Sequence, residues 1–468
     1  MEELCKTFGV FLIILNLTNI SAKEVLCENE VKVCVCRYEH KDGEDLSLLH
    51  VDCSLSHVNI LQNNYTLPKT VNTLIATSSN IEQIKESETL NSITMKNLLL
   101  NKNNISTIDV NALNLPNLEH LDLSENALEH FDPEIFRNVK KLKYLNLAYN
   151  KITTFADMPF HHLGILEEIV LSGNDIGDVL KRKSLFSRNG LAIHDGIKKI
   201  SIADINLNII HDNLLTGYHI RYLKISNNNI TTLPELPFTL EYLDFSDNPI
   251  TNLYFEDFSN LLALKELQLN NLKIREVDDF VFEPLKALKI LGLGRNANLT
   301  KFSPLAFGKE VLDDADDFAL EELSLHGSRL TTLSDKLEIP FGHLHRIDLQ
   351  GNRWKCDCNI LWLRYMQLPP EDTEYLRCYL PVNLYNIKMF SLDKERFICG
   401  EKNFPLATVA VIAFCVIFSA MTVWFFVFIP KYQSRGYNIQ HYFFPSAVYS
   451  PVSTEHRNVT YSRFGISL

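Results

Sequence analysis

The residues of this chain that are best suited to covalent or metal chemistry are two groups of four cysteines. They are Cys27, Cys34, Cys36 and Cys53, and Cys356, Cys358, Cys378 and Cys399. In a chain with secretory features, two such groups predict two disulfide frameworks. Zinc is the alternative, but zinc sites favour Cys-x2-Cys pairs or added histidine, and both groups here contain Cys-x-Cys. We therefore expect disulfides, no bound metal and no cofactor.

Catalytic chemistry has no support in the sequence. It contains no nucleophile elbow, no metal-ligand helix motif and no phosphate-binding loop. The 15 histidines are scattered, and we interpret the pair His161-His162 as a solvated loop. The chain is therefore expected not to be an enzyme.

The charge of the chain limits the classes of partner. The 468 residues carry a formal net charge of -12. Residues 431–468 hold four basic residues and one acidic residue, so the acidic excess lies in the part before them. An acidic exterior argues against nucleic acid or an anionic lipid surface as its partner.

Two apolar stretches predict targeting and membrane attachment. Phe8–Leu17 has the length of a signal-peptide core, so residues 1–22 are expected to be a signal peptide, with an uncleaved anchor as the alternative. Phe404–Ile429 contains no charged residue and is long enough to span a bilayer, with a buried core helix as the alternative. Lys431 and Arg435 follow it, which predicts a cytoplasmic C-terminus. The chain is thus expected to be a single-pass type I protein of the plasma membrane, with residues 430–468 as its tail.

Between these stretches the sequence repeats itself. In one copy Leu118, Leu121, Leu123, Asn126 and Leu128 are spaced as Leu-x-x-Leu-x-Leu-x-x-Asn-x-Leu. Twelve copies lie between residues 71 and 354, mostly 23 or 24 residues apart. Their fourth positions are Leu74, Leu98, Leu121, Leu145, Ile169, Ile200, Leu223, Leu243, Leu267, Leu291, Leu323 and Ile347. One repeat cannot bury its apolar edge alone, so stacking of repeats into a solenoid is expected.

Two further positions of the repeat predict how the turns are built. An asparagine side chain can satisfy backbone groups that leave the sheet pattern, and Ser79, Ile205, Leu272 and Ser328 replace it in four copies. We expect those four turns to be less regular. A second apolar position predicts a stacked aromatic spine of Phe136, Phe160, Phe258, Phe282 and Phe307.

The repeats and cysteines together resemble the extracellular leucine-rich-repeat family, as in Toll ectodomains and Slit, over roughly residues 27–400. The resemblance implies an α/β-type leucine-rich-repeat solenoid, a curved parallel β-sheet horseshoe. It also implies an N-terminal cysteine cap at 27–70 and a C-terminal cap at 355–400, which would cover the apolar ends of the solenoid. The family's pairing implies the disulfides Cys27–Cys36, Cys34–Cys53, Cys356–Cys378 and Cys358–Cys399.

Candidate contact residues lie on the concave strands and in two long repeats. Tyr144, Tyr149, Tyr222 and Tyr242 stand among acidic residues, which suits protein recognition, although exposed tyrosine is also ordinary in strands. One long repeat has a basic insert with Lys181 and Arg182, and the other has an acidic insert with Asp313, Asp314, Asp316 and Asp317. Both are partner loops or simply solvated loops. Calcium at the acidic insert is disfavoured because the spacing is not that of a calcium loop.

The sequence also contains short motifs for glycosylation and for sorting. Glycosylation is expected at Asn64, Asn104, Asn229 and Asn298, each of which begins an Asn-x-Ser/Thr sequon. In the tail, Tyr449 and Tyr461 begin four-residue patterns that resemble endocytic sorting signals, so cytoplasmic adaptors are candidate partners. The tail contains no Toll-type signalling domain. Two functions follow: a cell-surface recognition or adhesion receptor that binds protein partners through the repeats, or a co-receptor or regulatory subunit that docks through its transmembrane helix.

Overall fold

The computed structural model describes residues 25–27, 33–40, 47–54, 59–61, 65–86, 90–182, 184–186, 190–210, 214–215, 219–316, 318–399 and 406–428. The chain divides into two compact units, Met1–Cys399 and Gly400–Leu468. The predicted signal peptide, the sequon at Asn64, Asp317 and the tail tyrosines lie outside the described residues.

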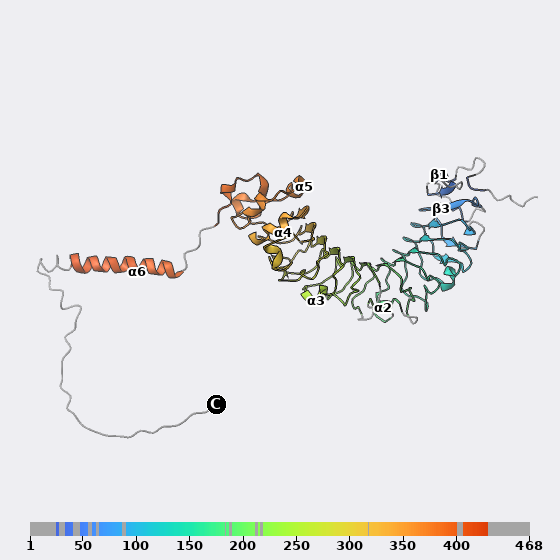
Figure 1. The fold of residues 1–468 in the computed structure, drawn as a ribbon, viewed down its shortest axis with the longest axis horizontal. Coiled ribbons are helices and arrows are strands. Elements are labelled where there is room, and N and C mark those ends of the chain that lie inside the picture. Colours follow the sequence, from blue (N-terminus) through green and yellow to red (C-terminus); the bar gives the residue numbers. More distant parts are fainter. Residues whose placement is uncertain are drawn as a thin grey trace, which may run out of the picture. The chain divides into compact units, whose positions relative to one another are not determined.

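The first unit is a curved solenoid built on one sheet of 14 strands in the order β1-β2-β3-β5-β7-β8-β9-β10-β11-β12-β13-β15-β17-β18 (Figure 1). All neighbours are parallel except the antiparallel pair β1 and β2. The strands are β1 (Val35–His40), β2 (Ser47–Asp52), β3 (Val71–Ile75), β5 (Asn97–Leu99), β7 (His120–Asp122), β8 (Tyr144–Asn146), β9 (Glu168–Val170), β10 (Lys199–Ser201), β11 (Tyr222–Lys224), β12 (Tyr242–Asp244), β13 (Glu266–Gln268), β15 (Ile290–Gly292), β17 (Glu322–Ser324) and β18 (Arg346–Asp348).

Short elements on the outer side of the arc connect these strands (Figure 1). Two small parallel ladders pair β4 (Gln83–Ile84) with β6 (Thr107–Ile108), and β14 (Glu276–Val277) with β16 (Lys301–Phe302). The helical turns are η2 (Pro133–Phe136), α2 (Gly177–Leu180), α3 (Phe255–Phe258), η3 (Glu310–Leu312), η4 (Asp335–Leu337) and α4 (Glu338–Gly342).

The predicted solenoid of twelve turns is confirmed. In the large sheet, the twelve strands from β3 to β18 each hold one predicted fourth position, and these residues are partners in the register, as in Leu121 with Leu145 and Leu145 with Ile169. Each of them is at most 2% exposed. Because all twelve side chains enter the same core, neighbouring turns bury the edge that a single turn leaves open.

The asparagines of the repeat join neighbouring turns. Asn126 donates from Nδ2 to the carbonyls of Leu123 in its own turn and Leu100 in the preceding turn, both at 3.0 Å. Its Oδ1 accepts from the amide of Ile105, also at 3.0 Å. Asn150 and Asn174 repeat the same pattern one and two turns later. Each buried amide therefore satisfies backbone groups of two turns at once.

The residue before each asparagine position adopts a left-handed backbone conformation. It has positive φ in all twelve turns, including those at Asp204, Asn271 and Gly327, where no asparagine follows. The prediction that the turns at Ser79, Ile205, Leu272 and Ser328 are less regular is therefore wrong for this conformation of the backbone. Those turns lack the asparagine side chain that bonds to the backbone of the neighbouring turn.

The predicted aromatic spine is present as two separate clusters. Phe131, Phe136, Phe155 and Phe160 are in mutual contact, with ring centroids 5.6–6.2 Å apart. Phe258, Phe282 and Phe307 form the second run, with 5.7 Å between neighbouring centroids. The rings are tilted or edge-on rather than parallel, as aromatic quadrupoles favour.

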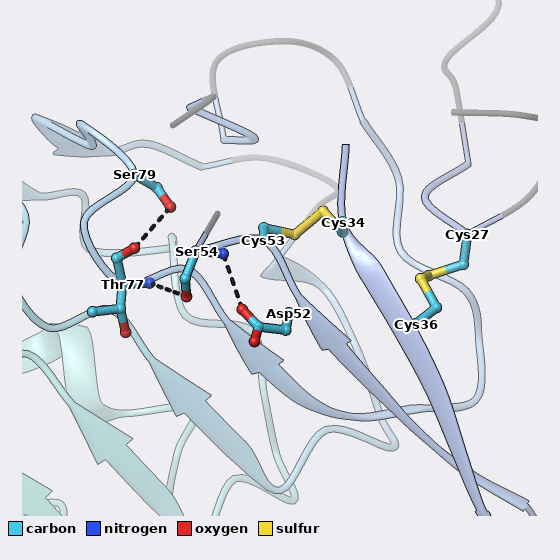
Figure 2. The surroundings of a disulfide bond; sticks show 8 residues. All are labelled: Cys27, Cys34, Cys36, Asp52, Cys53, Ser54, Thr77 and Ser79. Carbon is cyan, nitrogen blue, oxygen red and sulfur yellow. Dashed lines mark hydrogen bonds between the residues drawn. A yellow bond between two sulfur atoms is a disulfide. The ribbon is translucent and has the colours of Figure 1, made fainter. Parts of the chain in front are cut away.

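At the N-terminal end, disulfides hold β1 and the segment before it against the sheet. Figure 2 shows Cys34 joined to Cys53, at the end of β2, and Cys27 joined to Cys36 in β1. Beside them, Asp52 accepts from the amide of Ser54, whose hydroxyl accepts from the amide of Thr77 in the next turn. This pairing is the one that the resemblance implies.

At the C-terminal end, Cys356 is joined to Cys378 and Cys358 to Cys399, again as the resemblance implies. Asp372 is 2% exposed and accepts from the backbone amide of Ile347 in β18. It therefore satisfies part of the last strand's free edge. The helical turns here are η5 (Leu361–Tyr365), α5 (Pro370–Thr373), η6 (Val382–Leu384), η7 (Met389–Ser391) and η8 (Lys394–Arg396).

The second unit contains α6 (Leu406–Val423) and a π-helical turn, η9 (Trp424–Phe428). Helix is thus present within the predicted range 404–429. Among the described residues, however, no helix meets the length and apolarity that a bilayer crossing requires. The predicted transmembrane helix is therefore not confirmed.

Candidate functional site: the concave face of the sheet

Two rows of side chains cross the concave face in register from turn to turn. The charge row consists of the residue just before each strand, which is two positions before the strand's central apolar residue. The tyrosine row consists of the first residue of successive strands. Members of the charge row are Lys96, Glu119, Lys143, Glu167, Lys198, Arg221, Glu241, Lys265, Lys289 and Glu321.

Opposite charges alternate along much of the charge row and pair with each other. Glu119 lies 3.2 Å from Lys96 and 2.8 Å from Lys143, so it bridges three turns. Glu241 bridges Arg221 and Lys265 in the same way, at 3.4 and 2.7 Å. The hydrogen bond from Lys143 holds the pKa of Glu119 below its usual value, and Lys265 does the same for Glu241. These charges are occupied within the solenoid and leave little unpaired charge to recognise a partner.

The tyrosine row runs over five neighbouring strands, β8 to β12. Tyr144, Glu168, Lys199, Tyr222 and Tyr242 are successive partners in the register. Glu168 and Lys199 are an ion pair at 3.2 Å, and the rings of Tyr222 and Tyr242 are stacked with centroids 4.0 Å apart and planes 6° apart. Burial raises the pKa of both Tyr144 and Tyr242, and the hydrogen bond with Tyr222 raises that of Tyr242 further. Both phenols therefore stay neutral at physiological pH.

Tyr149 does not belong to this row, which corrects the prediction that it lies on a concave strand. It is the left-handed residue of its turn, with φ 53°, and 57% of it is exposed. Its ring covers Gly173 so closely that a Cβ there would be 2.3 Å from its Cδ1. Tyr149 therefore helps to pack two turns together. The structure places Tyr144, Tyr222 and Tyr242 on one row, with Tyr144 separated from the stacked pair by Glu168 and Lys199.

A hollow of about 460 Å³ lies further along the concave face, across β13, β15, β17 and β18. Gly292, at the end of β15, lines it without a side chain, and a Cβ there would be 2.0 Å from Gln268 Oε1. One wall carries Arg346, whose guanidinium is 3.3 Å from Asp372. Such a recess can accept a side chain that protrudes from a partner.

The predicted glycosylation sites and inserts lie away from both rows. Asn104, Asn229 and Asn298 are exposed. In the basic insert, Lys181 pairs with Asp178 at 2.6 Å in α2, whereas Lys183 and Arg188 lie outside the described residues. In the acidic insert, Asp314 accepts from the amide of Asp316 at 3.0 Å. Glycosylation at these positions stays a prediction.

Family models match this repeat directly. Models described as leucine-rich repeat match residues 93–138, 128–176 and 239–261. These matches and the twelve stacked turns agree with a leucine-rich-repeat fold. Several curated proteins are similar to this chain over about half of its length.

Tsukushi of Gallus gallus is 27% identical over 258 residues, which are 54% of this chain and 67% of Tsukushi. Chaoptin of Tribolium castaneum is 25% identical over 281 residues, 57% of this chain and 34% of chaoptin. Among solved structures, the leucine-rich-repeat domain of APL1B is similar with a TM-score of 0.45 and 19% identity, covering 76% of this chain and 91% of that one. The chain thus spans only about a third of chaoptin's length.

Proposed function

We propose that this chain is a cell-surface recognition receptor whose leucine-rich repeats bind a protein partner through the tyrosine row of the concave face. The observation that carries the proposal is the stacked pair Tyr222 and Tyr242. Two adjacent aromatic rings, held in place by each other and by the sheet, offer apolar contact area that loses little rotamer freedom on binding.

The surroundings of the pair also suit a protein ligand. On one side, Lys199 and Glu168 provide paired charges at the edge of the contact. On the other, the hollow begins at β13, the strand next to that of Tyr242, and continues to β18. An aromatic centre with a polar rim is the composition of protein interfaces, in contrast with the basic surface needed for nucleic acid.

The test is binding of labelled residues 23–403, which include the whole described solenoid, to an array of cell-surface and secreted proteins. Once a partner is found, the double variant Tyr222→Ala, Tyr242→Ala is expected to weaken binding at least about tenfold, as loss of aromatic hot spots does. Tyr375→Ala is the control, because that tyrosine is 63% exposed in the C-terminal disulfide region. Equal affinity of both variants for the partner would exclude the tyrosine row.

Membrane attachment is a separate part of the proposal and depends on sequence alone. The support is the run of 26 residues without charge at 404–429, followed by Lys431 and Arg435. Extraction of the full chain from cell membranes tests it: detergent is expected to release the protein and alkaline carbonate is not. Release by carbonate, or secretion of the full chain into the medium, would contradict an anchor at 404–429.

The alternative is a co-receptor that docks through residues 404–429. It predicts that partner capture survives deletion of the repeats and is lost when 404–429 is replaced by an unrelated apolar segment. The receptor proposal predicts the opposite result in both experiments. Sorting by adaptors at Tyr449 and Tyr461 is tested by whether alanine at both positions raises the amount of chain at the cell surface.

A further inference from the structure

A group of metal-binding side chains lies on the outer side of the solenoid, away from the concave face. Glu134 belongs to η2, and His161 and His162 follow Phe160 in the next turn. One candidate ligand atom from each of the three lies within 4.8 Å of the other two. The sequence predicted a solvated pair of histidines, and the repeat pattern does not connect them to Glu134, which is 28 residues from His162.

Local hydrogen bonds fix the backbone at Glu134 and the ring of His161. Asp132 caps η2 by accepting from the amide of Glu134 at 2.9 Å, which fixes the start of that turn. The carbonyl of Met158 accepts from the amide of His161 and from its Nδ1, at 3.3 and 2.7 Å. Met158 is itself bonded through its amide to the carbonyl of Gly190, in the basic insert. A histidine that donates from one ring nitrogen to a carbonyl is oriented as metal-ligating histidines are.

Between the three side chains there are more hydrogen-bond acceptors than donors. Because a carbonyl only accepts, the proton of neutral His161 is on Nδ1, and its Nε2 presents a lone pair toward Glu134 Oε1, 3.9 Å away. His162 Nε2 lies 3.1 Å from the same oxygen. Neutral imidazoles therefore bring at most one proton to three acceptor atoms, so at least one lone pair in the group is left for water or a cation.

The distances fit a tetrahedral ion. Metal bonds of about 2.0–2.2 Å to nitrogen and oxygen place neighbouring ligand atoms roughly 3.4 Å apart. The two separations from Glu134 Oε1, 3.1 and 3.9 Å, lie on either side of that value. Small side-chain rotations are sufficient to equalise them, since all three residues are at the surface with side chains 21–47% exposed.

We propose that Glu134, His161 and His162 bind a divalent transition-metal ion, with Zn²⁺ as the reference ion. Two imidazole nitrogens and one carboxylate oxygen suit zinc, and they disfavour calcium and magnesium, which take oxygen ligands. Three protein ligands leave a coordination position open to water or to a side chain of a bound protein. The site is separate from the tyrosine row, so it stands whether or not that row binds a partner.

The test is isothermal titration of the purified full-length chain, stripped with a chelator, with zinc chloride. We expect one zinc ion per chain. The double variant His161→Ala, His162→Ala should abolish that binding. Glu134→Gln, which keeps the size of the side chain and loses its charge, should weaken it at least about tenfold. The matched control is His343→Ala, His345→Ala, a second pair of exposed histidines outside the group, which should bind like the parent.

Cobalt substitution provides a second measurement, because tetrahedral cobalt absorbs visible light strongly and free cobalt in water does not. The absorption is expected in the parent and the control and not in either site variant. Circular dichroism of each variant verifies its fold. No zinc binding by the parent, or undiminished binding by the folded double variant, would overturn the proposal. Loss of binding in the control alone would assign the metal to His343 and His345 instead.

Discussion

Residues 118–176 and 177–236 of the solenoid build the same backbone turn with different side chains. In the regular region (118–176), Asn126, Asn150 and Asn174 link each turn to its neighbour. In the interrupted region (177–236), Ile205 occupies the asparagine position and is fully buried. The left-handed residue before that position is nevertheless kept, with φ 53° at Tyr149 and 55° at Asp204. The asparagine is thus not needed to form the turn, and its contribution lies in joining neighbouring turns.

The hydrogen bonds around Ile205 show how its turn manages without the asparagine. In the regular region, the amide of Ile152 donates to Asn174 Oδ1 of the next turn. The equivalent amide of Ile176 donates instead to the carbonyl of Asn174, and Gly177 donates to the carbonyl of Ile205. The chain then enters α2 and the basic insert. Both long repeats lead into turns without asparagine, at Ile205 and Ser328. Each insert therefore precedes a turn that lacks the side-chain link to its neighbour.

The largest effect is expected from the aromatic spine of the regular region. Phe136 is fully buried against Phe131 and Phe160. Phe136→Ala should lower the free energy of unfolding by about 3–5 kcal/mol, because it removes a large core side chain and leaves a cavity. Urea denaturation of residues 23–403 measures it. Phe238→Ala, just beyond the interrupted region, is the control, since Phe238 is 67% exposed and its loss should cost less than about 0.5 kcal/mol.

A reciprocal exchange at the asparagine position tests the comparison itself. Asn150→Ile should cost about 2–3 kcal/mol, because buried backbone groups of two turns lose a partner. Ile205→Asn should cost less than about 1.5 kcal/mol, since the new side-chain amide can donate to the backbone carbonyls that accept from asparagine in the other turns. Denaturant midpoints of the two variants measure the difference. Equal costs would show that the asparagine is interchangeable with an apolar residue throughout.

Close packing of turns in the regular region also depends on Gly173. It has φ 72°, and a Cβ would be 2.3 Å from the ring of Tyr149. Gly173→Ala is expected to destabilise by about 1–3 kcal/mol, from backbone strain and displacement of that ring. Gly164 provides the matched control, because nothing lies within 4 Å of its Cβ position. If both alanine variants melted at the same temperature, the close contact between Gly173 and Tyr149 would contribute nothing to the stability of the fold.

The smallest effect is expected from the charge row, and it depends on pH. Hydrogen bonding by Lys143 lowers the pKa of Glu119 in the folded chain. This carboxylate therefore stabilises the fold above its unfolded pKa of about 4.3, and the contribution is lost as pH falls through the lower folded pKa. Glu119→Gln should accordingly show a shallower loss of stability below about pH 4.3 than the parent. Superimposable curves of denaturant midpoint against pH would mean that the ion pair adds nothing.

The candidate site was predictable only in part. Tyrosines on the strands were visible from the repeat spacing, but the stacking of Tyr222 on Tyr242 needed the register of β11 with β12. Tyr149 was misplaced because the repeat pattern does not show that its position is left-handed. The hollow at Gly292 was missed because an absent side chain gives no signal until its neighbours are known.

The sequence by itself determined the twelve turns, their core residues and the kind of side chain at each turn, because these depend on a short pattern that every repeat restates. Only the tertiary structure decided which charges and ligands meet. Glu134 and His162 are 28 residues apart, and stacking brings them to 3.1 Å because one repeat length of chain returns to nearly the same place in the next turn. The exact length of each repeat sets which side chains then face each other, and that length varies along this chain.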